Sequence, residues 1–209
     1  MTDHSPSRPA AAPGPPGPRP VDWSEADWLN PPAAVTRLGD TMIVTTHPDS
    51  DFWRTTSYGF VHDNGHCLLT GFPVGSAVEV SFVAEFAEQF DQAGLMVRVD
   101  ESTWIKAGIE FADGFPQLGA VVTRGLSDWS TGRVPQWAGR TVTVRASRSG
   151  DAVTIRARTG DQPWQLVRLA PLDPAAQAGA GPMCCSPGSR ALTVCFTGFT
   201  AGPADESLH

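Results

Sequence analysis

The sequence predicts an all-β protein in which two antiparallel sheets pack face to face as a sandwich. The first observation is a series of nine short segments that alternate apolar and polar residues or are rich in β-branched residues, as strands on a core do. The second is that turn-forming sequences such as Asp113-Gly114 and Thr159-Gly160-Asp161 stand between segments. With 209 residues, the chain is long enough to bury one such core, so we expect a single domain.

Pattern and composition place the strands as follows. The nine predicted strands are residues 41–46, 76–84, 93–99, 103–111, 118–123, 141–147, 152–158, 164–170 and 191–199. One further segment, AEFAEQF at 84–90, has Phe86 and Phe90 four residues apart, which is a helical spacing. We therefore expect one helical turn there.

The two ends of the chain differ in composition from this region. Residues 1–20 are dense in proline and glycine and contain no aliphatic side chain larger than alanine after Met1, so burial cannot offset the entropy lost on ordering. This composition predicts a disordered Pro-rich tail. The alternative is that residues 13–20 adopt a polyproline helix and act as a ligand for another protein. The single sandwich domain then covers 21–203, and a flexible C-terminal tail follows at 204–209.

The charge balance argues against nucleic-acid partners. The 15 basic and 22 acidic residues give a formal net charge of −7, which is the wrong sign for a surface that follows phosphates. No apolar run approaches the roughly 20 residues needed to cross a bilayer, and the N-terminus lacks the apolar region of a signal peptide. We therefore expect neither nucleic acid nor a membrane as partner.

The cysteine pattern favours a reducing compartment. Cys67, Cys184, Cys185 and Cys195 include an adjacent pair, which fits neither a simple disulfide framework nor a CxxC metal motif. We expect buried, reduced thiols and a cytoplasmic location. A secreted form with one disulfide is the alternative.

The most informative region is 92–111, which predicts two strands joined by a tight turn at Asp100, Glu101 and Ser102. Alternation places the aliphatic residues of each strand on one face, and directly opposed residues of an antiparallel pair share a face. The two aliphatic rows can therefore meet in the core only if the loop has an odd number of residues. A loop of those three turn residues satisfies this condition.

The same register brings a polar row out on the opposite face. Its members are Gln92, Gly94, Met96, Arg98, Trp104, Lys106, Gly108 and Glu110. Gln92 then lies across from Glu110, and Arg98 lies across from Trp104. Gly94 and Gly108 fall side by side, which we expect to leave a shallow depression walled by longer side chains.

This face has the residue types of a carbohydrate site. A planar aromatic side chain can cover the apolar face of a sugar ring, while amide, carboxylate and cationic groups engage its hydroxyl groups. Lys106 is the single lysine of the chain, and arginine does not replace a compact ammonium group in a tight site. The alternative is a solvated face on which Arg98 stacks against Trp104.

Four stretches of the chain resemble a known family. They are DFWRTTSYGFVHDNGH at 51–66, DQAGLMVRVDESTWIKAGIEFADG at 91–114, VVTRGLSDWS at 121–130 and GPMCCSP at 181–187. Through them, the region from about Trp28 to Phe199 is similar to the regulation of enolase protein family, a domain of unknown function. The resemblance implies a jelly-roll sandwich of the concanavalin A-like lectin and glucanase superfamily, and a role in regulating enolase is suggested for a fungal member.

The resemblance also points to site residues, some of which the strand register selects independently. They are Gln92, Lys106 and Glu110 in the hairpin, and Asp51, Trp53, Tyr58, His62, Asp128 and Trp129 in the flanking motifs. For Trp53 and Tyr58 the alternative is a core position at the open end of the sandwich. Trp129 stands among small polar residues, which a core position explains poorly.

Glycoside hydrolysis is the main enzymatic alternative. It requires two carboxyl groups, and Glu110 is one candidate acid or base. Its cross-strand partner is Gln92, so the hairpin supplies no second carboxylate, although Asp128, Glu79 and Glu85 remain open as contributions from other strands. We do not expect catalysis.

A metal site is not expected. His62, Asp63 and His66 carry suitable ligand atoms, but 63–65 has the sequence Asp-Asn-Gly of a hairpin turn. Such a turn would leave the two histidines as cross-strand neighbours rather than as ligands. Cys67 lies in a β pattern and is interpreted as a small buried side chain rather than a nucleophile.

Alternation also places Arg145 and Arg156 outward on another sheet face. We expect a solvated basic strip there, with an acidic polymer or a protein partner as the alternative.

The leading hypothesis is a non-catalytic or regulatory module that binds a carbohydrate or another small polar metabolite, without cofactor or metal. The candidate ligand-binding residues are Gln92, Arg98, Trp104, Lys106, Glu110, Asp128, Trp129, Tyr58 and His62. The alternatives are a glycan-active, glycoside hydrolase-like enzyme with Glu110 as acid or base, and a protein-interaction module.

Overall fold

The computed structural model describes residues 17–208 of the chain. The predicted disordered tail therefore lies outside the described residues, except for its last four. Of these, Arg19–Pro20 form the short strand β1, which pairs with the last strand of the chain. Two short 3-10 helices, η1 (Trp23–Glu25) and η2 (Pro135–Trp137), are the helical segments of the described part.

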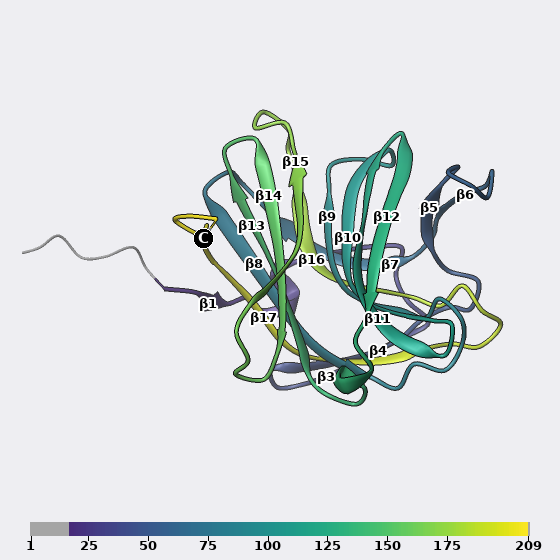
Figure 1. The fold of residues 1–209 in the computed structure, drawn as a ribbon. Helices are drawn as coiled ribbons and strands as arrows, with labels where there is room; N and C mark the ends of the chain where they lie inside the picture. The colour runs from purple at the N-terminus through teal and green to yellow at the C-terminus, as the bar shows by residue number, and fades with distance from the viewer. Residues whose placement is uncertain (1–16, 209) are drawn as a thin grey trace, which may run out of the picture.

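Two large antiparallel sheets form the body of the protein, and Figure 1 shows them packed side by side. The eight-stranded sheet has the order β15-β14-β13-β8-β17-β4-β3, with β1 added to β17. Beside β1, its strands are β3 (Ala34–Leu38), β4 (Thr41–Thr45), β8 (Ser76–Ala84), β13 (Val142–Ser149), β14 (Ala152–Thr159), β15 (Gln165–Pro171) and β17 (Thr193–Pro203).

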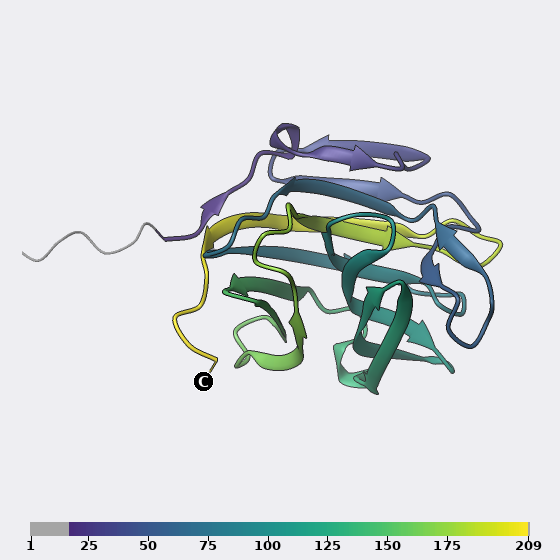
Figure 2. The same ribbon diagram turned by 90° about the horizontal axis from the view of Figure 1, so that it is seen from above.

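The seven-stranded sheet has the order β12-β11-β10-β9-β16-β7-β2. Its strands are β2 (Asp27–Leu29), β7 (His66–Gly71), β9 (Gln92–Arg98), β10 (Thr103–Ala112), β11 (Phe115–Arg124), β12 (Leu126–Arg133) and β16 (Gly179–Cys185). Figure 2 shows the sandwich from above, with β1 and the C-terminal residues at the same end.

A separate pair of strands, β5 (Phe52–Arg54) and β6 (Val61–Asp63), forms a third, two-stranded sheet. In Figure 1 this pair lies beside the seven-stranded sheet, on the side away from the eight-stranded sheet. We call the side of the seven-stranded sheet that faces this pair its outer face. The pair is small, but it decides which part of the outer face is open.

All nine predicted strands are present, as β4, β8, β9, β10, β11, β13, β14, β15 and β17. The predicted all-β sandwich of two antiparallel sheets is therefore confirmed. Several strands that the pattern did not predict are short, such as β1, β2, β5 and β6. β16 escaped prediction for another reason: it is buried on both faces, so its residues do not alternate between apolar and polar types.

The predicted helical turn at 84–90 is wrong. The residues after Ala84 form a loop, and Phe90 adopts a left-handed backbone conformation with φ of 69°. The Asp91 carboxylate accepts hydrogen bonds from the backbone N–H groups of Ala87 and Glu88, at 3.0 and 2.9 Å. These side-chain bonds hold a turn where a helix would need backbone bonds.

The predicted hairpin turn at 63–65 is also wrong. β6 pairs with β5, whereas β7 pairs with β16 and β2, so this segment carries the chain from the small sheet to the seven-stranded sheet. The Asn64 side chain holds the crossing, because it accepts from the Asp51 N–H at 3.0 Å and donates to the Asp49 carbonyl at 2.7 Å. A turn sequence shows where the chain bends but not which strands it joins.

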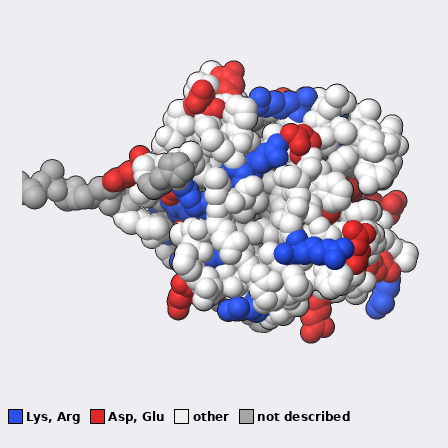
Figure 3. Space-filling view, in the orientation of Figure 1, with Lys and Arg blue, Asp and Glu red and all other residues white. Residues whose placement is uncertain are grey.

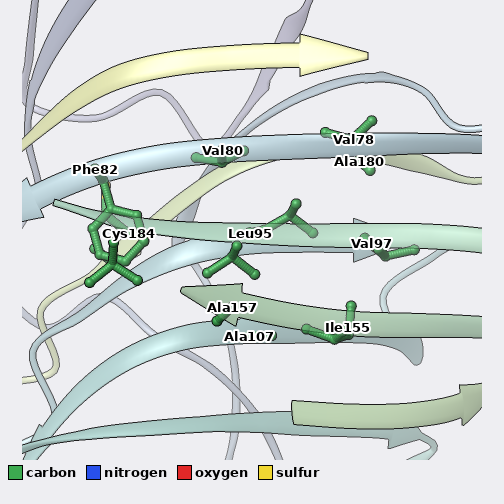
Figure 4. Packing of buried hydrophobic residues seen from close by; sticks show 14 of the residues in the cluster. Val78, Val80, Phe82, Leu95, Val97, Ala107, Ile155, Ala157, Ala180 and Cys184 are labelled. Carbon is green, nitrogen blue, oxygen red and sulfur yellow. The ribbon is translucent and has the colours of Figure 1, made fainter. Parts of the chain in front are cut away.

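The main core fills the space between the two large sheets. Figure 4 shows Val80 and Phe82 of β8 with Leu95 and Val97 of β9, and all four side chains are buried. The aliphatic row of β9 thus faces the interior as predicted. Cys184 of β16 belongs to the same cluster.

A second apolar cluster lies on the outer face. Its buried members are Phe52, Trp53, Cys67, Met96, Trp104, Val121, Met183 and Cys185. Phe52 and Trp53 come from β5, and the others come from the seven-stranded sheet beneath it. Cys184 and Cys185 are neighbours in the chain, but they point to opposite faces of β16 and so belong to different clusters.

The register of the predicted hairpin is confirmed. Gln92 lies opposite Glu110, Gly94 opposite Gly108 and Arg98 opposite Trp104. The N–H of Val99 donates to the carbonyl of Thr103 at 3.0 Å, which closes the three-residue loop at 100–102. The polar row therefore emerges on the outer face.

Charged side chains of both signs are interspersed on the surface in view in Figure 3. Arg145 and Arg156 are cross-strand neighbours as predicted, but the expected solvated basic strip is wrong. Arg145 forms ion pairs with Glu79 at 2.7 Å and with Asp205 at 2.8 Å, and Arg156 also pairs with Asp205. Residues near the C-terminus therefore cover and neutralise this strip.

No helix in the part of the chain that the structure describes has the length and apolar character needed to span a bilayer. All four cysteines are free thiols, and three of them are buried.

Candidate functional site

The outer face carries a pocket of about 190 Å³ beside the small sheet. Its lining residues are Asp51, Trp53, Tyr58, Phe60, Phe90, Gln92, Lys106, Glu110, Trp129 and Pro187. They come from the four stretches that carry the family resemblance, apart from Phe90, which directly precedes one of them. Segments far apart in the sequence therefore converge on this pocket.

Lys106 and Asp51 form an ion pair on the polar side of the pocket. Lys106 Nζ donates to Asp51 Oδ1 at 2.9 Å, and Gln92 Nε2 donates to the same oxygen at 3.2 Å. Burial of Lys106 lowers the pKa of its ammonium group, but the charge of Asp51, with smaller effects of Cys185 and Glu110, outweighs burial and raises the pKa above its ordinary value. Lys106 is therefore a charged, paired group rather than a neutral nucleophile.

Glu110 has a different environment. Its Oε1 atom is buried and has no hydrogen-bond partner among the described residues. Burial raises the pKa of this carboxyl group to about 7, although the Lys106 charge opposes the shift and the Asp51 charge adds to it. The pocket is therefore lined by a carboxyl group that changes charge near neutral pH.

Aromatic side chains form a second part of the pocket wall. The Trp53 and Trp129 rings are nearly perpendicular, with centroids 6.4 Å apart, and Tyr58 meets Trp53 edge-on at 5.5 Å. Phe60 stacks on Tyr58 at 5.5 Å, and Phe90 meets Trp129 at 6.4 Å. Tyr58 is 52% exposed and Trp129 is 39% exposed, which is unusual for large aromatic side chains without a ligand or partner.

Backbone strain accompanies this wall. Phe90 has φ of 69°, and in the β5–β6 loop Thr55 and Ser57 have φ of 62° and 66°. Bulky and β-branched residues rarely adopt this left-handed region, and residues held in it tend to lie at binding sites. Trp53 Nε1 donates to the carbonyl of Thr56 at 3.0 Å, which fixes the ring against this strained loop.

A row of glycines crosses the sheet beneath the pocket. Gly94, Gly108 and Gly119 are paired across β9, β10 and β11. A Cβ atom on Gly94 would lie 2.0 Å from the carbonyl oxygen of Ala107, and one on Gly108 would lie 2.2 Å from that of Ala93. A separate narrow recess of about 20 Å³ is lined in part by Gly108 and Gly119 but not by Gly94.

Two of the predicted site residues lie on the outer face but not in the pocket. Trp104 is only 2% exposed and meets the ring of Phe52 at 6.0 Å. Arg98 forms a bidentate ion pair with Asp63 at 2.7 and 2.8 Å, and its guanidinium group lies 5.8 Å from the Phe52 ring. The expectation that Arg98 and Trp104 line an open surface is wrong, because β5 and β6 cover them.

Asp128 and His62 are also displaced from the pocket. Asp128 lies on the opposite side of β12 from Trp129 and forms an ion pair with Arg168 of β15 at 2.6 Å. His62 lies behind Phe60, with the two rings edge to face at 4.7 Å. Of the predicted ligand-binding residues, the pocket thus brings together Gln92, Lys106, Glu110, Trp129 and Tyr58.

Three lining residues were not predicted from the sequence, namely Phe60, Phe90 and Pro187. Phe60 could have been found, because Tyr58, Phe60 and His62 alternate within one of the resembling stretches. Phe90 could not, since its position depends on a left-handed turn that the sequence does not signal. Pro187 carries no pattern that marks it as part of a site.

The histidines of the 62–66 segment serve the fold. His66 is buried, its Nε2 atom accepts from the His47 N–H at 3.0 Å, and its Nδ1 atom lies 2.8 Å from the carbonyl oxygen of Asn30. Burial lowers the pKa of His66, which favours the neutral ring. No group of three or more His, Cys, Asp or Glu side chains within residues 17–208 is arranged to hold a metal ion.

The fold and the pocket define a two-sheet antiparallel β-sandwich with a ligand-sized cavity on the outer face of one sheet. The chain belongs to the family described as "Protein of unknown function (DUF1349)", which matches residues 28–204. The predicted resemblance and the predicted fold class are thereby confirmed.

A yeast sequence and a yeast crystal structure are each similar to the chain over most of their length. The chain is 38% identical over 192 residues to "Regulation of enolase protein 1" of Saccharomyces cerevisiae, covering 90% of this chain and 96% of that protein. A crystal structure of a functionally unknown protein from Saccharomyces cerevisiae superposes with a TM-score of 0.84 at 34% identity, over 88% of this chain and all of the other.

A plant lectin shares the architecture at a greater distance. The lectin from Bauhinia forficata, solved in complex with GalNAc, superposes with a TM-score of 0.54 at 10% identity, over 88% of this chain and 94% of the lectin. At this identity the likeness concerns the fold alone.

Proposed function

We propose that the protein is a binding module, with a regulatory rather than a catalytic role, that holds a carbohydrate or a similar polyhydroxylated metabolite in the outer-face pocket. The observation that carries the proposal is that aromatic rings and charged groups line one cavity. The rings are those of Tyr58 and Trp129 among others, and the charged groups are the unpartnered Glu110 carboxyl group and the Lys106–Asp51 pair. Sugars have both an apolar ring face and hydroxyl groups, so they match this division.

The size and composition of the pocket support a small ligand. A volume of about 190 Å³ suits a single sugar ring rather than a long polymer. Gln92 and Asp51 supply an amide and a carboxylate, and Tyr58 and Trp129 supply flat surfaces at the entrance. The lectin likeness adds the fold but no residue of the site.

The test is a thermal-shift screen of neutral hexoses, sugar acids and sugar phosphates on the wild-type protein and on Trp129→Ala. A ligand that binds the native state stabilises it, and the stabilisation grows with the ratio of ligand concentration to Kd. A ligand that binds therefore raises Tm. We expect at least one saccharide to raise the wild-type Tm and the Trp129→Ala variant to lose most of that shift. A matched control is Trp164→Ala, since Trp164 lies against Arg158 on the other sheet.

The result that contradicts the proposal is a screen in which no saccharide raises Tm while a protein partner is recovered from the source organism. That result would instead favour the protein-interaction alternative. Loss of the shift in Trp164→Ala but not in Trp129→Ala would place saccharide binding outside the pocket.

One observation favours an enzyme as the second candidate. Asp51 brings a carboxyl group into the same pocket as Glu110, and the pKa of about 7 suits Glu110 to act as a general acid. Against this, Asp51 is held by Lys106 and Gln92. Turnover of a glycan by the wild type, lost in Glu110→Gln, would establish the enzyme, and binding without turnover would favour the module.

A further inference from the structure

Three charged side chains line the pocket, and two of them neutralise each other. Lys106 and Asp51 are in direct contact at 2.9 Å, so the pair carries no net charge toward a ligand. Glu110 is the third, and its Oε1 atom has no partner among the described residues. The charge in the pocket that is not held in an ion pair is therefore that of the Glu110 carboxylate.

Nearby arginines do not alter this balance. Arg98 is committed to Asp63 beneath the small sheet, with two bonds below 3.0 Å. Arg54 of β5 donates to the carbonyl oxygens of Gly125 and Glu101 and does not line the pocket. A phosphate or a carboxylate in the pocket would therefore approach Glu110 without a free cation to offset the repulsion.

The aromatic wall reinforces the preference for positive charge. The cavity is lined by the rings of Trp53, Tyr58, Phe60, Phe90 and Trp129, and several of these rings meet edge to face. The faces of such rings carry negative potential and attract an ammonium group within about 6 Å. A neutral sugar needs one such platform, whereas rings set at steep angles to each other favour a cation.

We propose that the ligand presents an ammonium group to Glu110, so that saccharides with a free amino group are preferred over neutral, acetylated or phosphorylated ones. This inference rests on the proposed function and names the subclass of polyhydroxylated ligand. Glu110 supplies the charge-assisted hydrogen bond, and the rings of Trp53 and Trp129 supply the surrounding surface. Acetylation of the amine removes its positive charge, and a phosphate group on the sugar carries negative charge instead.

Titration of Glu110 gives the preference a pH dependence. The titratable groups that act on its carboxyl group are Lys106 on the same strand and Asp51 before β5, and Tyr58 of the β5–β6 loop lines the same pocket. Since the pKa of Glu110 is about 7, the carboxylate form that attracts an ammonium group prevails above neutral pH. The preference for the amine should therefore weaken as the solution is acidified.

The experiment is isothermal calorimetry with matched series based on glucose, galactose and mannose. Each series contains the parent hexose, its amino sugar, the N-acetylated amino sugar and the hexose phosphate. We expect the amino sugar of the accepted series to bind about 10-fold more tightly than its parent and its N-acetyl form, which is the effect of one charge-assisted bond. The phosphate should bind most weakly.

Glu110→Gln tests whether Glu110 is the anchor, that is, the group that binds the ammonium group, because glutamine keeps the size of the side chain and removes its charge. The amine advantage should fall to below about 3-fold in this variant. The control is Glu101→Gln, which makes the same chemical change in the exposed hairpin loop and should keep the full advantage.

A second measurement uses the wild type alone. A hexose with an aliphatic amine in place of its primary hydroxyl group stays protonated between about pH 6 and pH 8, so any change in its advantage over the parent reports on the protein. We expect the advantage to fall several-fold on acidification. This arm is independent of whether Glu110→Gln folds.

The outcomes separate the two proposals. If neutral hexoses bind and the amino forms bind no better, or if the phosphate binds most tightly, the inference about the amine is overturned and the proposed function stands. If no member of any series binds, both are overturned. An amine advantage that persists in Glu110→Gln and at low pH would overturn the assignment of Glu110 as its anchor.

Discussion

The two ends of the outer face are built by the same pair of strands, yet one end is covered and the other is open. At one end, Arg98 and Trp104 lie under the small sheet. Phe52 of β5 covers the indole ring of Trp104, and Asp63 of β6 binds the guanidinium group of Arg98. At the other end, Lys106 and Glu110 line an open pocket. Both ends emerge from one alternating row, so alternation alone does not separate a buried layer from a binding site.

The difference lies in what covers the sheet. β5 and β6 have three residues each, and their footprint divides the face into a part that stabilises the fold and a part that a ligand can reach. The lesson is that a polar row on a strand gives the orientation of side chains, while their accessibility depends on segments elsewhere in the chain. The comparison predicts that substitutions at the two ends affect different measurements.

The largest effect is expected at the covered end. Trp104→Ala removes a fully buried ring from beneath Phe52 and should lower the free energy of unfolding by about 3–5 kcal/mol, measured by urea denaturation. Trp129→Ala makes the same change at the open end and should cost less than about 1 kcal/mol. Equal losses in the two variants would break the division of the face.

The next effect concerns the ion pair at the border of the pocket. Lys106→Met leaves the Asp51 carboxylate half-buried without its cation, and we expect a loss of about 3 kcal/mol in unfolding free energy. The double variant Asp51→Asn with Lys106→Met removes both charges and should be more stable than Lys106→Met alone. If the double variant is the less stable of the two, the pair does not compensate as described.

A smaller effect is expected from pH. In the folded protein the pKa of Glu110 is about 7, above its ordinary value of 4.5, so the folded state keeps a proton that the unfolded state has lost. This contribution to stability is fully present below about pH 4.5 and is lost as the pH rises through about 7, by about 3 kcal/mol.

The Glu110 contribution is measured as the difference in unfolding free energy between the wild type and Glu110→Gln across this range. The difference should change with pH in the stated direction, whereas the same difference for the Glu101→Gln control should stay constant. A wild type whose pH profile parallels that of Glu110→Gln would show that Glu110 titrates normally.

Much of the fold could be predicted because it depends on local pattern. The 92–111 hairpin follows from alternation and loop parity, and its pairing of Gln92 with Glu110 is present in the structure. The site was predicted only in part. That Lys106 would emerge on the outer face follows from its own strand, but its partner Asp51 lies more than 50 residues away, and no local rule links the two.

The failures have a common physical cause. The Asp-Asn-Gly sequence at 63–65 favours a bend, yet the chain crosses between sheets there because β6 finds its partner in β5. Likewise, Phe86 and Phe90 have helical spacing, but the Asp91 carboxylate accepts hydrogen bonds from backbone N–H groups of this segment and holds it in a turn. In each case a contact outside the short window of the pattern decides the outcome.

The paired thiols of β16 have a practical use. Because Cys184 is enclosed between the two large sheets and Cys185 lies under the small one, a thiol-reactive reagent can label each only when its own layer opens. In a background that carries Cys67→Ser and Cys195→Ser, the labelling rates of Cys184→Ser and Cys185→Ser would therefore tell detachment of the β5–β6 cover apart from separation of the sandwich, because each variant keeps one reporter.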